Sequence, residues 1–185
     1  MIHSISRNVP QEDTAKTTDA DTFCFQMAYQ MDGTFDVRSA SKRLPEGVII
    51  CSPKLIAGQD HIDGILSQAK EYWLRGETLA RNKSIDLLMR ITCQRQISDA
   101  VIASGISNAD ALAIFGIVKT ESEIKEGVEI IRSVAKDLKR SDDLLSLDNE
   151  KQKFLQKFHA LPSWLSKDQL VVALKEKSVL LVLSK

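Results

Sequence analysis

The sequence predicts an α+β fold: one small mixed or antiparallel sheet of about four strands, packed by about six helices. Four short apolar runs have strand character, and the segments between them have helical spacing. The helices do not alternate singly with the strands, which disfavours a doubly wound sheet. A chain of 185 residues, 43% hydrophobic and 27% charged, is typical of one globular domain.

The N-terminal part of the chain predicts an arm, a strand, a short helix and a second strand. Residues 1–20 are polar and predict a weakly ordered arm, followed by a single domain over 21–185. TFCFQMAY, residues 22–29, places Phe23, Phe25, Met27 and Tyr29 at every second position, on one face, as a strand does. A short helix is expected within 32–46, and GVIIC at 47–51 is typical of a buried strand.

The middle of the chain predicts three helices. Asp60 is expected to cap the first, whose apolar positions recur at helical spacing, and Gly76 is expected to end it. A second helix is predicted over 84–93. A third is predicted over 97–104, ending at Gly105.

The next strand is predicted at ALAIFGIV, residues 111–118. Thr120 and Glu123 have the spacing of a capping box, which predicts a long helix from there to about Lys139. The segment SDDLLSLDNE that follows is predicted to be a loop.

The C-terminal part predicts two helices and a closing strand. Residues 150–160 have helical spacing, and Ser166 with Gln169 forms a second capping box. SVLLVL, residues 178–183, is apolar and rich in valine and leucine, which favours a last strand.

Composition narrows the classes of function. The formal net charge is zero, which argues against a broad electrostatic grip on duplex nucleic acid or an anionic membrane. No apolar run approaches the ~18 residues of a membrane span. The three cysteines are isolated and lack C-x-x-C spacing, so a reduced, cytoplasmic protein is expected.

Motifs for catalysis are missing from the sequence. It contains no glycine-rich phosphate loop and no G-x-S-x-G elbow, and its three histidines lack metal-ligand spacing. We therefore expect no cofactor, no metal and no enzymatic activity. The enzymatic alternative uses Cys93 as a nucleophile, because Arg90 and Arg95 could lower the pKa of its thiol.

The stretch LLMRITCQRQISDAV, residues 87–101, is unusually rich in long polar side chains. One continuous helix would place Gln96 on the apolar face, so a break at about 93–97 is predicted. The helix that begins near Ile97 would then offer free N–H groups near Arg90 and Arg95, as in an anion or nucleotide-end pocket. A turn held by local side-chain hydrogen bonds fits the pattern equally well.

These residues carry a resemblance to a known family. The series Arg90-Ile-Thr-Cys-Gln-Arg-Gln-Ile97, with its flanking helices, resembles the small tRNA-binding subunits of the KEOPS complex, the family of the p53-related-protein-kinase-binding protein. Archaeal members commonly read R-A-S-G-Q-R-Q-I, so Thr92 and Cys93 stand where those members have serine and glycine. The order of the predicted elements over residues 20–185 is also similar.

The resemblance implies a non-catalytic role. KEOPS makes the threonylcarbamoyl modification on the adenosine beside the anticodon of certain tRNAs. The small subunit binds the kinase-like ATPase subunit and, in archaeal relatives, holds the single-stranded 3′ CCA end of the tRNA. Zero net charge is compatible with gripping a short single-stranded end through stacking and base-edge contacts.

The residues predicted to bind the RNA end lie around this stretch. They are Arg90, Gln94, Arg95, Gln96, Asn82, Lys83 and, at the rim, Lys70. Arginine can pair with phosphate or stack on a base, and glutamine can read a base edge.

The residues predicted to bind the kinase-like ATPase lie in the C-terminal helices and are more apolar than a short terminal segment requires. They are Leu155, Phe158, Leu161, Trp164 and Leu165. Packing against the sheet is the alternative for each of them. The alternative function is a regulator that binds the ATPase without binding tRNA, and the change at Thr92 and Cys93 motivates it.

Overall fold

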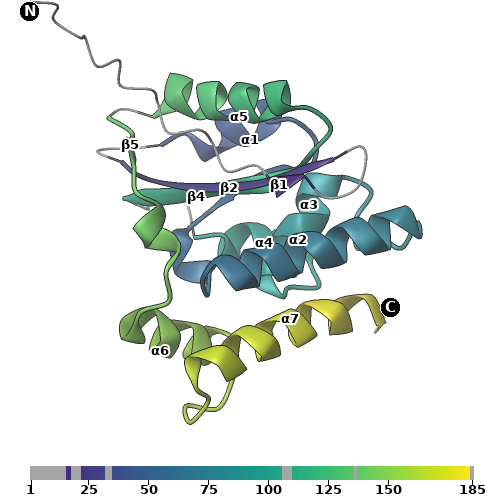
Figure 1. The fold of residues 1–185 in the computed structure, drawn as a ribbon, viewed down its shortest axis with the longest axis vertical. Helices are drawn as coiled ribbons and strands as arrows, with labels where there is room; N and C mark the ends of the chain where they lie inside the picture. The colour runs from purple at the N-terminus through teal and green to yellow at the C-terminus, as the bar shows by residue number, and fades with distance from the viewer. Residues whose placement is uncertain (1–15, 18–21, 32–34, 106–109, 136, 184–185) are drawn as a thin grey trace, which may run out of the picture.

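The computed structural model describes residues 16–17, 22–31, 35–105, 110–135 and 137–183, and it confirms the α+β fold (Figure 1). Helices cover both faces of an antiparallel sheet. One face carries α1 (Val37–Arg43) and α5 (Glu121–Val134). The other carries α2 (Gln59–Leu74), α3 (Lys83–Thr92) and α4 (Ile97–Ala103). A further layer, α6 (Asn149–Phe158) and α7 (Lys167–Leu183), lies beyond α2.

The sheet has the order β1–β2–β4–β3, and every neighbouring pair is antiparallel. Its long strands are β2 (Phe23–Gln30), β3 (Val48–Cys51) and β4 (Ala111–Val118), which confirms the strands predicted at 22–29, 47–51 and 111–118. Two-residue strands, β1 (Lys16–Thr17) and β5 (Lys139–Arg140), pair with opposite ends of β2.

The central strand, β4, is buried on both faces because helices cover each side of the sheet. Phe115 and Ile117 pack under α2 and α3, whereas Leu112 and Ile114 pack under α1 and α5. This division arises because successive side chains of a strand point to opposite faces of the sheet. A smaller cluster holds α6 and α7 to the short 3₁₀ helix η1 (Pro53–Leu55) and the segment after it.

The C-terminal boundary of α2 agrees with the prediction, whereas its N-terminal cap differs from the prediction. Gly76 follows α2 with a φ of 73°, as a terminating glycine does. Asp60, however, is not the cap that we predicted. The N-cap is Gly58, and Asp60 lies in the first turn, where its carboxylate faces the positive end of the helix dipole.

The prediction of a closing strand at 178–183 is wrong. These residues continue α7, which runs for 17 residues after the capping box of Ser166 and Gln169. No glycine or proline interrupts the segment after Ser166. The buried positions Leu174, Ser178 and Leu181 recur at helical spacing, so packing outweighs the strand preference of valine.

α5 ends earlier than predicted. The Thr120–Glu123 capping box is present, but the helix stops at Val134 rather than near Lys139. Lys139 instead belongs to β5, which pairs with Tyr29 and Gln30 of β2. The predicted loop over 141–150 contains the 3₁₀ helix η2 (Asp142–Leu145).

Two further expectations concern the N-terminal arm and the absence of a membrane span. The predicted arm over 1–20 lies outside the described residues, except for Lys16 and Thr17. Among the helices that the structure describes, none has both the length and the apolar character needed to cross a membrane.

Candidate nucleic-acid interface

The helix break predicted at about 93–97 is present. α3 ends at Thr92, and Cys93 adopts a left-handed conformation with a φ of 52°. The backbone N–H groups of Cys93 and Gln94 donate to the carbonyls of Arg90 and Met89, which closes the end of α3. The chain then turns, and α4 begins at Ile97.

A positive φ is the conformation that glycine adopts most easily, and archaeal members of the family that this stretch resembles commonly have glycine at this position. Here Cys93 adopts it, so the bend forms without a glycine. Its Sγ lies 3.8 Å from the carbonyl oxygen of Leu174 on α7. Burial raises the pKa of the Cys93 thiol from 9.0 to about 12, although Lys177 acts in the opposite direction. A thiol that keeps its proton at neutral pH is a poor nucleophile, which disfavours the enzymatic alternative.

Arg90 does not line a surface pocket as we predicted. Its side chain is 0% exposed, and its Nε donates to Oδ2 of Asp86 at 2.6 Å. The guanidinium lies 5.0 Å from the ring centroid of Tyr72 on α2. The other carboxylate oxygen of Asp86 accepts from the backbone N–H of Leu79 at 2.6 Å. Arg90 therefore belongs to a buried network that fastens the connection between α2 and α3.

The side chains of Arg95 and Gln96 are exposed at the junction, and Gln94 is half-buried. Gln96 is the N-cap residue of α4, and its side chain makes no capping hydrogen bond. α4 has only seven residues and carries Asp99 in its first turn, so its N-terminus already faces a carboxylate. An RNA contact here would depend on the side chains rather than on the helix dipole.

Asn82 and Lys83 lie at the opposite end of α3 from this junction. Asn82 is the N-cap of α3, and its Oδ1 accepts from the N–H of Ile85 at 3.0 Å. The Nζ of Lys83 lies 5.2 Å from the ring centroid of Trp73. A ten-residue helix is about 15 Å long, so these residues and Arg95 do not form one compact pocket. Lys70 is half-buried on α2.

A cleft that the sequence did not predict lies beside the start of α3. It has a volume of about 470 Å³ and is lined by α1, β3, α3 and α4, including Asn82, Ser84, Val101 and Ser104. Its walls come from segments far apart in the sequence, so no local pattern could have indicated it. Ser84 also accepts a hydrogen bond from the N–H of Gly47, which ties α3 to the start of β3.

α4 connects the junction to this cleft. Ile97 and Val101 are one helical turn apart, and both are exposed. Val101 also lines the cleft, so an apolar ridge leads from Gln96 towards Asn82. We call the surface formed by Arg95, Gln96, Ile97, Val101 and Asn82 the α4 face.

The five residues predicted to bind a partner occupy different environments. Leu155 is fully buried between α6 and α7, so it is a core residue and not a surface contact. Phe158, Leu161 and Leu165 are half-buried. Only Trp164 is well exposed, at 74%.

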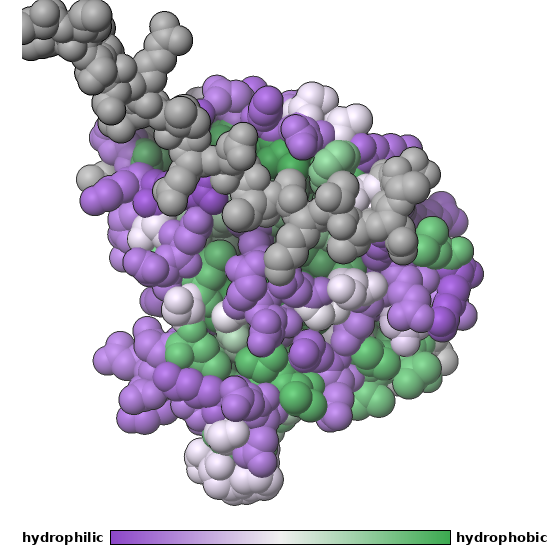
Figure 2. Space-filling model, viewed as in Figure 1, coloured by the Kyte–Doolittle hydropathy of each residue, from purple (hydrophilic) through white to green (hydrophobic). Residues whose placement is uncertain are grey.

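α7 exposes apolar side chains that the sequence did not single out. Val172, Leu180 and Leu183 are each at least half exposed, although the opposite side of the helix is buried. Figure 2 shows apolar side chains among polar ones over the region of α2 and α7. Leu180 and Leu183 were missed because residues 178–183 were predicted as a strand.

The buried histidines are structural. Nδ1 of His61 accepts from the backbone N–H of Ala57 at 3.2 Å, just before α2. His159 lies at the end of α6 and is 4% exposed. The described residues contain no group of three or more potential metal ligands.

Comparison of the chain with protein-family models and with curated proteins finds no match.

Proposed function

We propose that this protein is a non-catalytic subunit of a KEOPS-type complex that recruits tRNA through its single-stranded 3′ CCA end. The proposal rests on the resemblance around Arg90–Ile97 and on one observation. The break at Cys93 places Arg95 and Gln96 in solvent, at the start of an apolar ridge that leads to a cleft. A single strand lying along α4 could contact these features in succession.

The chemistry of the α4 face suits a short RNA end. Arg95 can pair with a phosphate or stack on a base, and Gln96 can hydrogen-bond to a base edge. Asn82, Ser84 and Ser104 provide polar atoms around a largely apolar cleft of about 470 Å³, which is within the size range of small-ligand sites. Because few phosphates would be contacted, the affinity should fall only gently with salt.

The kinase-like ATPase subunit is the proposed protein partner. Trp164 and the exposed apolar side of α7 support this part of the proposal. Aromatic anchors of this kind contribute strongly to protein interfaces when a partner buries them. The α4 face and Trp164 are separate surfaces, so the two binding activities can be tested independently.

The test compares the binding of the full chain to tRNA and to the same tRNA lacking its CCA end. Arg95→Glu reverses a charge on the α4 face, and Val101→Glu places a charge on its exposed ridge. The matched control is Lys153→Glu, which makes the same charge change at an exposed position of α6, outside the cleft and the α4 face. We expect loss of binding on removal of CCA and in both α4 variants, with the control unaffected.

The opposite result would favour a second function. If binding is absent, or is insensitive to CCA and to Arg95, the protein would instead be a regulator of the ATPase without tRNA binding of its own. The burial of Arg90 favours this alternative, because it removes one cation from the predicted RNA site. Titration with the ATPase subunit, comparing Trp164→Ala with wild type, would then be decisive.

A further inference from the structure

A largely apolar groove between α2 and α7 is open to solvent. α7 lies alongside α2 in the outer helical layer of the molecule (Figure 1). The groove has a volume of about 410 Å³ and is lined by Gln68, Val172, Lys175, Glu176, Val179 and Leu180. Val172 and Leu180 are at least half exposed. Apolar side chains that gather on one side of a helix indicate an interaction surface.

The open side of α7 has the spacing of a helix that packs along another helix. Val172, Glu176, Val179 and Leu183 follow one another at intervals of four, three and four residues, which places them on one side. The buried Leu174 lies on the opposite side. A second helix is therefore the element that fits this surface best.

Two opposite charges, Lys175 and Glu176, lie at the middle of this side. Neither forms an ion pair among the described residues. The stem of Lys175 packs over Gly64 of α2, where a Cβ would collide with the lysine Cδ. The absence of a side chain at Gly64 thus lets Lys175 lie half-buried beside the groove.

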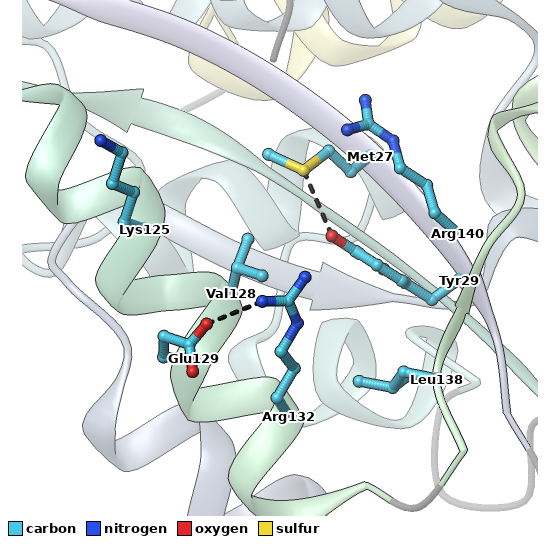
Figure 3. Close-up of a pocket in the computed structure, with 8 residues that line it drawn as sticks. All are labelled: Met27, Tyr29, Lys125, Val128, Glu129, Arg132, Leu138 and Arg140. Atoms are coloured by element: carbon cyan, nitrogen blue, oxygen red, sulfur yellow. Dashed lines mark hydrogen bonds and ion pairs between the residues drawn. The ribbon is translucent and has the colours of Figure 1, made fainter. Parts of the chain in front are cut away.

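Charged residues of another pocket, between α5, β2 and β5, already pair within the chain (Figure 3). There Arg132 donates to Glu129 at 2.8 Å, and Arg140 donates to Asp142 at 2.9 Å. Lys175 and Glu176 cannot pair with each other in this way, because adjacent residues of a helix do not face each other. Their charges fit a molecule that presents both signs.

We propose that a second copy of this chain covers the groove, with the two α7 helices paired antiparallel in a symmetric dimer. A two-fold axis between Lys175 and Glu176 would place Lys175 of each copy opposite Glu176 of the other. The same axis would place Val172 of each copy opposite Val179 of the other. One surface would thus supply both members of every contact, as a two-fold interface requires.

The overall charge of the chain is compatible with self-association. The formal net charge is zero, so two copies do not repel each other over long distances. Proteins without net charge also associate more readily than strongly charged ones.

The size of the surface predicts a weak dimer. α7 has 17 residues and is about 26 Å long. A strip of that length across two helices, each about 10 Å wide, covers roughly 500 Å² per copy. Because stable interfaces bury about 800 Å² per partner, we expect a Kd of roughly 10–100 μM.

Self-association does not depend on the proposed function. An ATPase subunit bound over the apolar side of α7 would compete with the second copy, because both would cover Val172 and Leu180. The experiment uses the chain alone, so its outcome is independent of tRNA and ATPase binding.

The experiment is sedimentation equilibrium of the full chain over a range of about 5–500 μM, which spans the expected Kd. We expect the mass to rise from that of the 20.6 kDa chain towards twice that value. A monomer at every concentration would overturn the proposal.

Charge reversal makes the test specific for the antiparallel pairing. Lys175→Glu and Glu176→Lys each place like charges opposite one another, so each should weaken the dimer at least tenfold. The double variant restores both pairs and should regain the wild-type Kd. An equimolar mixture of the two single variants should also associate, because each pair then joins opposite charges.

The matched control is Lys153→Glu, at an exposed position of α6 outside the groove, which should leave the Kd unchanged. Val172→Glu places a charge in the groove and should abolish the dimer. Association that is insensitive to Val172→Glu would overturn the proposal, because the contact would lie elsewhere. Failure of the mixed single variants to associate would overturn the antiparallel pairing.

Discussion

Arg90 and Arg132 each pair with a carboxylate on their own helix, but the two pairs occupy opposite environments. Arg90 and Asp86 are joined at 2.6 Å, and both side chains are 0% exposed. Arg132 and Glu129 are joined at 2.8 Å, with side chains 57% and 68% exposed. The local chemistry is nearly the same, so the comparison shows that the surroundings of a helix decide whether such a pair is part of the core or is exposed to solvent.

The difference follows from how each helix is surrounded. α3 contacts β3, α2, α4 and α7, so its polar residues Asp86, Arg90 and Thr92 lie inside the protein. α5 packs against the sheet and α1, and the side that carries Arg132 faces solvent. A buried arginine needs a partner because an isolated charge is costly away from water, whereas an exposed arginine is solvated.

The largest expected effect comes from breaking the buried pair. Arg90→Met should lower the free energy of unfolding by about 3–5 kcal/mol, because Asp86 is left buried without its partner. Arg132→Met should change it by less than about 1 kcal/mol, as for other exposed pairs. Urea denaturation of both variants measures the difference.

A double substitution is the control for this prediction. Replacing Arg90 and Asp86 together by Met and Leu should restore part of the lost stability, because no unpaired charge remains inside. If Arg90→Met and Arg132→Met cost the same, the contrast between the two pairs is wrong.

The same contrast applies to the predicted partner residues. Leu155→Ala should destabilise the protein by about 2–5 kcal/mol, because it leaves a cavity between α6 and α7. Trp164→Ala should change stability by no more than about 0.5 kcal/mol. If the proposed function is correct, it should also weaken binding of the proposed partner, the kinase-like ATPase. Thermal unfolding and a pull-down of the ATPase test both statements, and a large stability loss in Trp164→Ala would contradict the assignment.

Acid should destabilise the protein through its buried histidines. Burial lowers the pKa of His61 to about 3, with His159 and Lys175 adding to the effect, and burial lowers the pKa of His159 to about 4, with Lys177 adding to it. Unfolded histidine titrates near pH 6.5. This stability is therefore complete above about pH 6.5 and is lost as the pH falls towards the folded pKa values.

The measurement is the free energy of unfolding between pH 7 and pH 5. Each histidine can contribute a slope of up to about 1.4 kcal/mol per pH unit. His159→Gln should reduce the wild-type slope by about half. An unchanged slope in this variant would show that other groups cause the acid sensitivity.

A smaller effect than that of the buried pair is expected at the bend formed by Cys93. Cys93→Val should cost about 1–2 kcal/mol, because a β-branched residue fits a left-handed backbone poorly. Cys24→Val is the matched control, since Cys24 is half-buried in a strand where valine is favoured. Equal effects of the two substitutions, measured by urea denaturation, would show that the backbone at Cys93 is not strained.

Much of the fold could be predicted from local signals. The period of two marked β2, and the apolar run ALAIFGIV marked β4. The pairs Thr120–Glu123 and Ser166–Gln169 marked the starts of α5 and α7. The mismatch of Gln96 with a continuous helix indicated the break before α4. Each of these signals needs only a few neighbouring residues.

The candidate sites were harder to predict because they depend on neighbours that are distant in sequence. Arg90 and Arg95 lie in one polar stretch of the sequence. Arg90 is nevertheless buried against Tyr72 and Asp86, whereas Arg95 is exposed. The cleft beside Asn82 combines a strand and three helices from separate parts of the chain, α1, β3, α3 and α4.

The sequence alone determined where most helices and strands begin and end, because capping, turns and periodicity act over one or two turns of chain. The tertiary structure decided which polar groups are buried, why residues 178–183 are helical, and which surfaces remain open. Those outcomes depend on contacts between elements that are distant in the sequence, and a short stretch of sequence does not show which elements will meet.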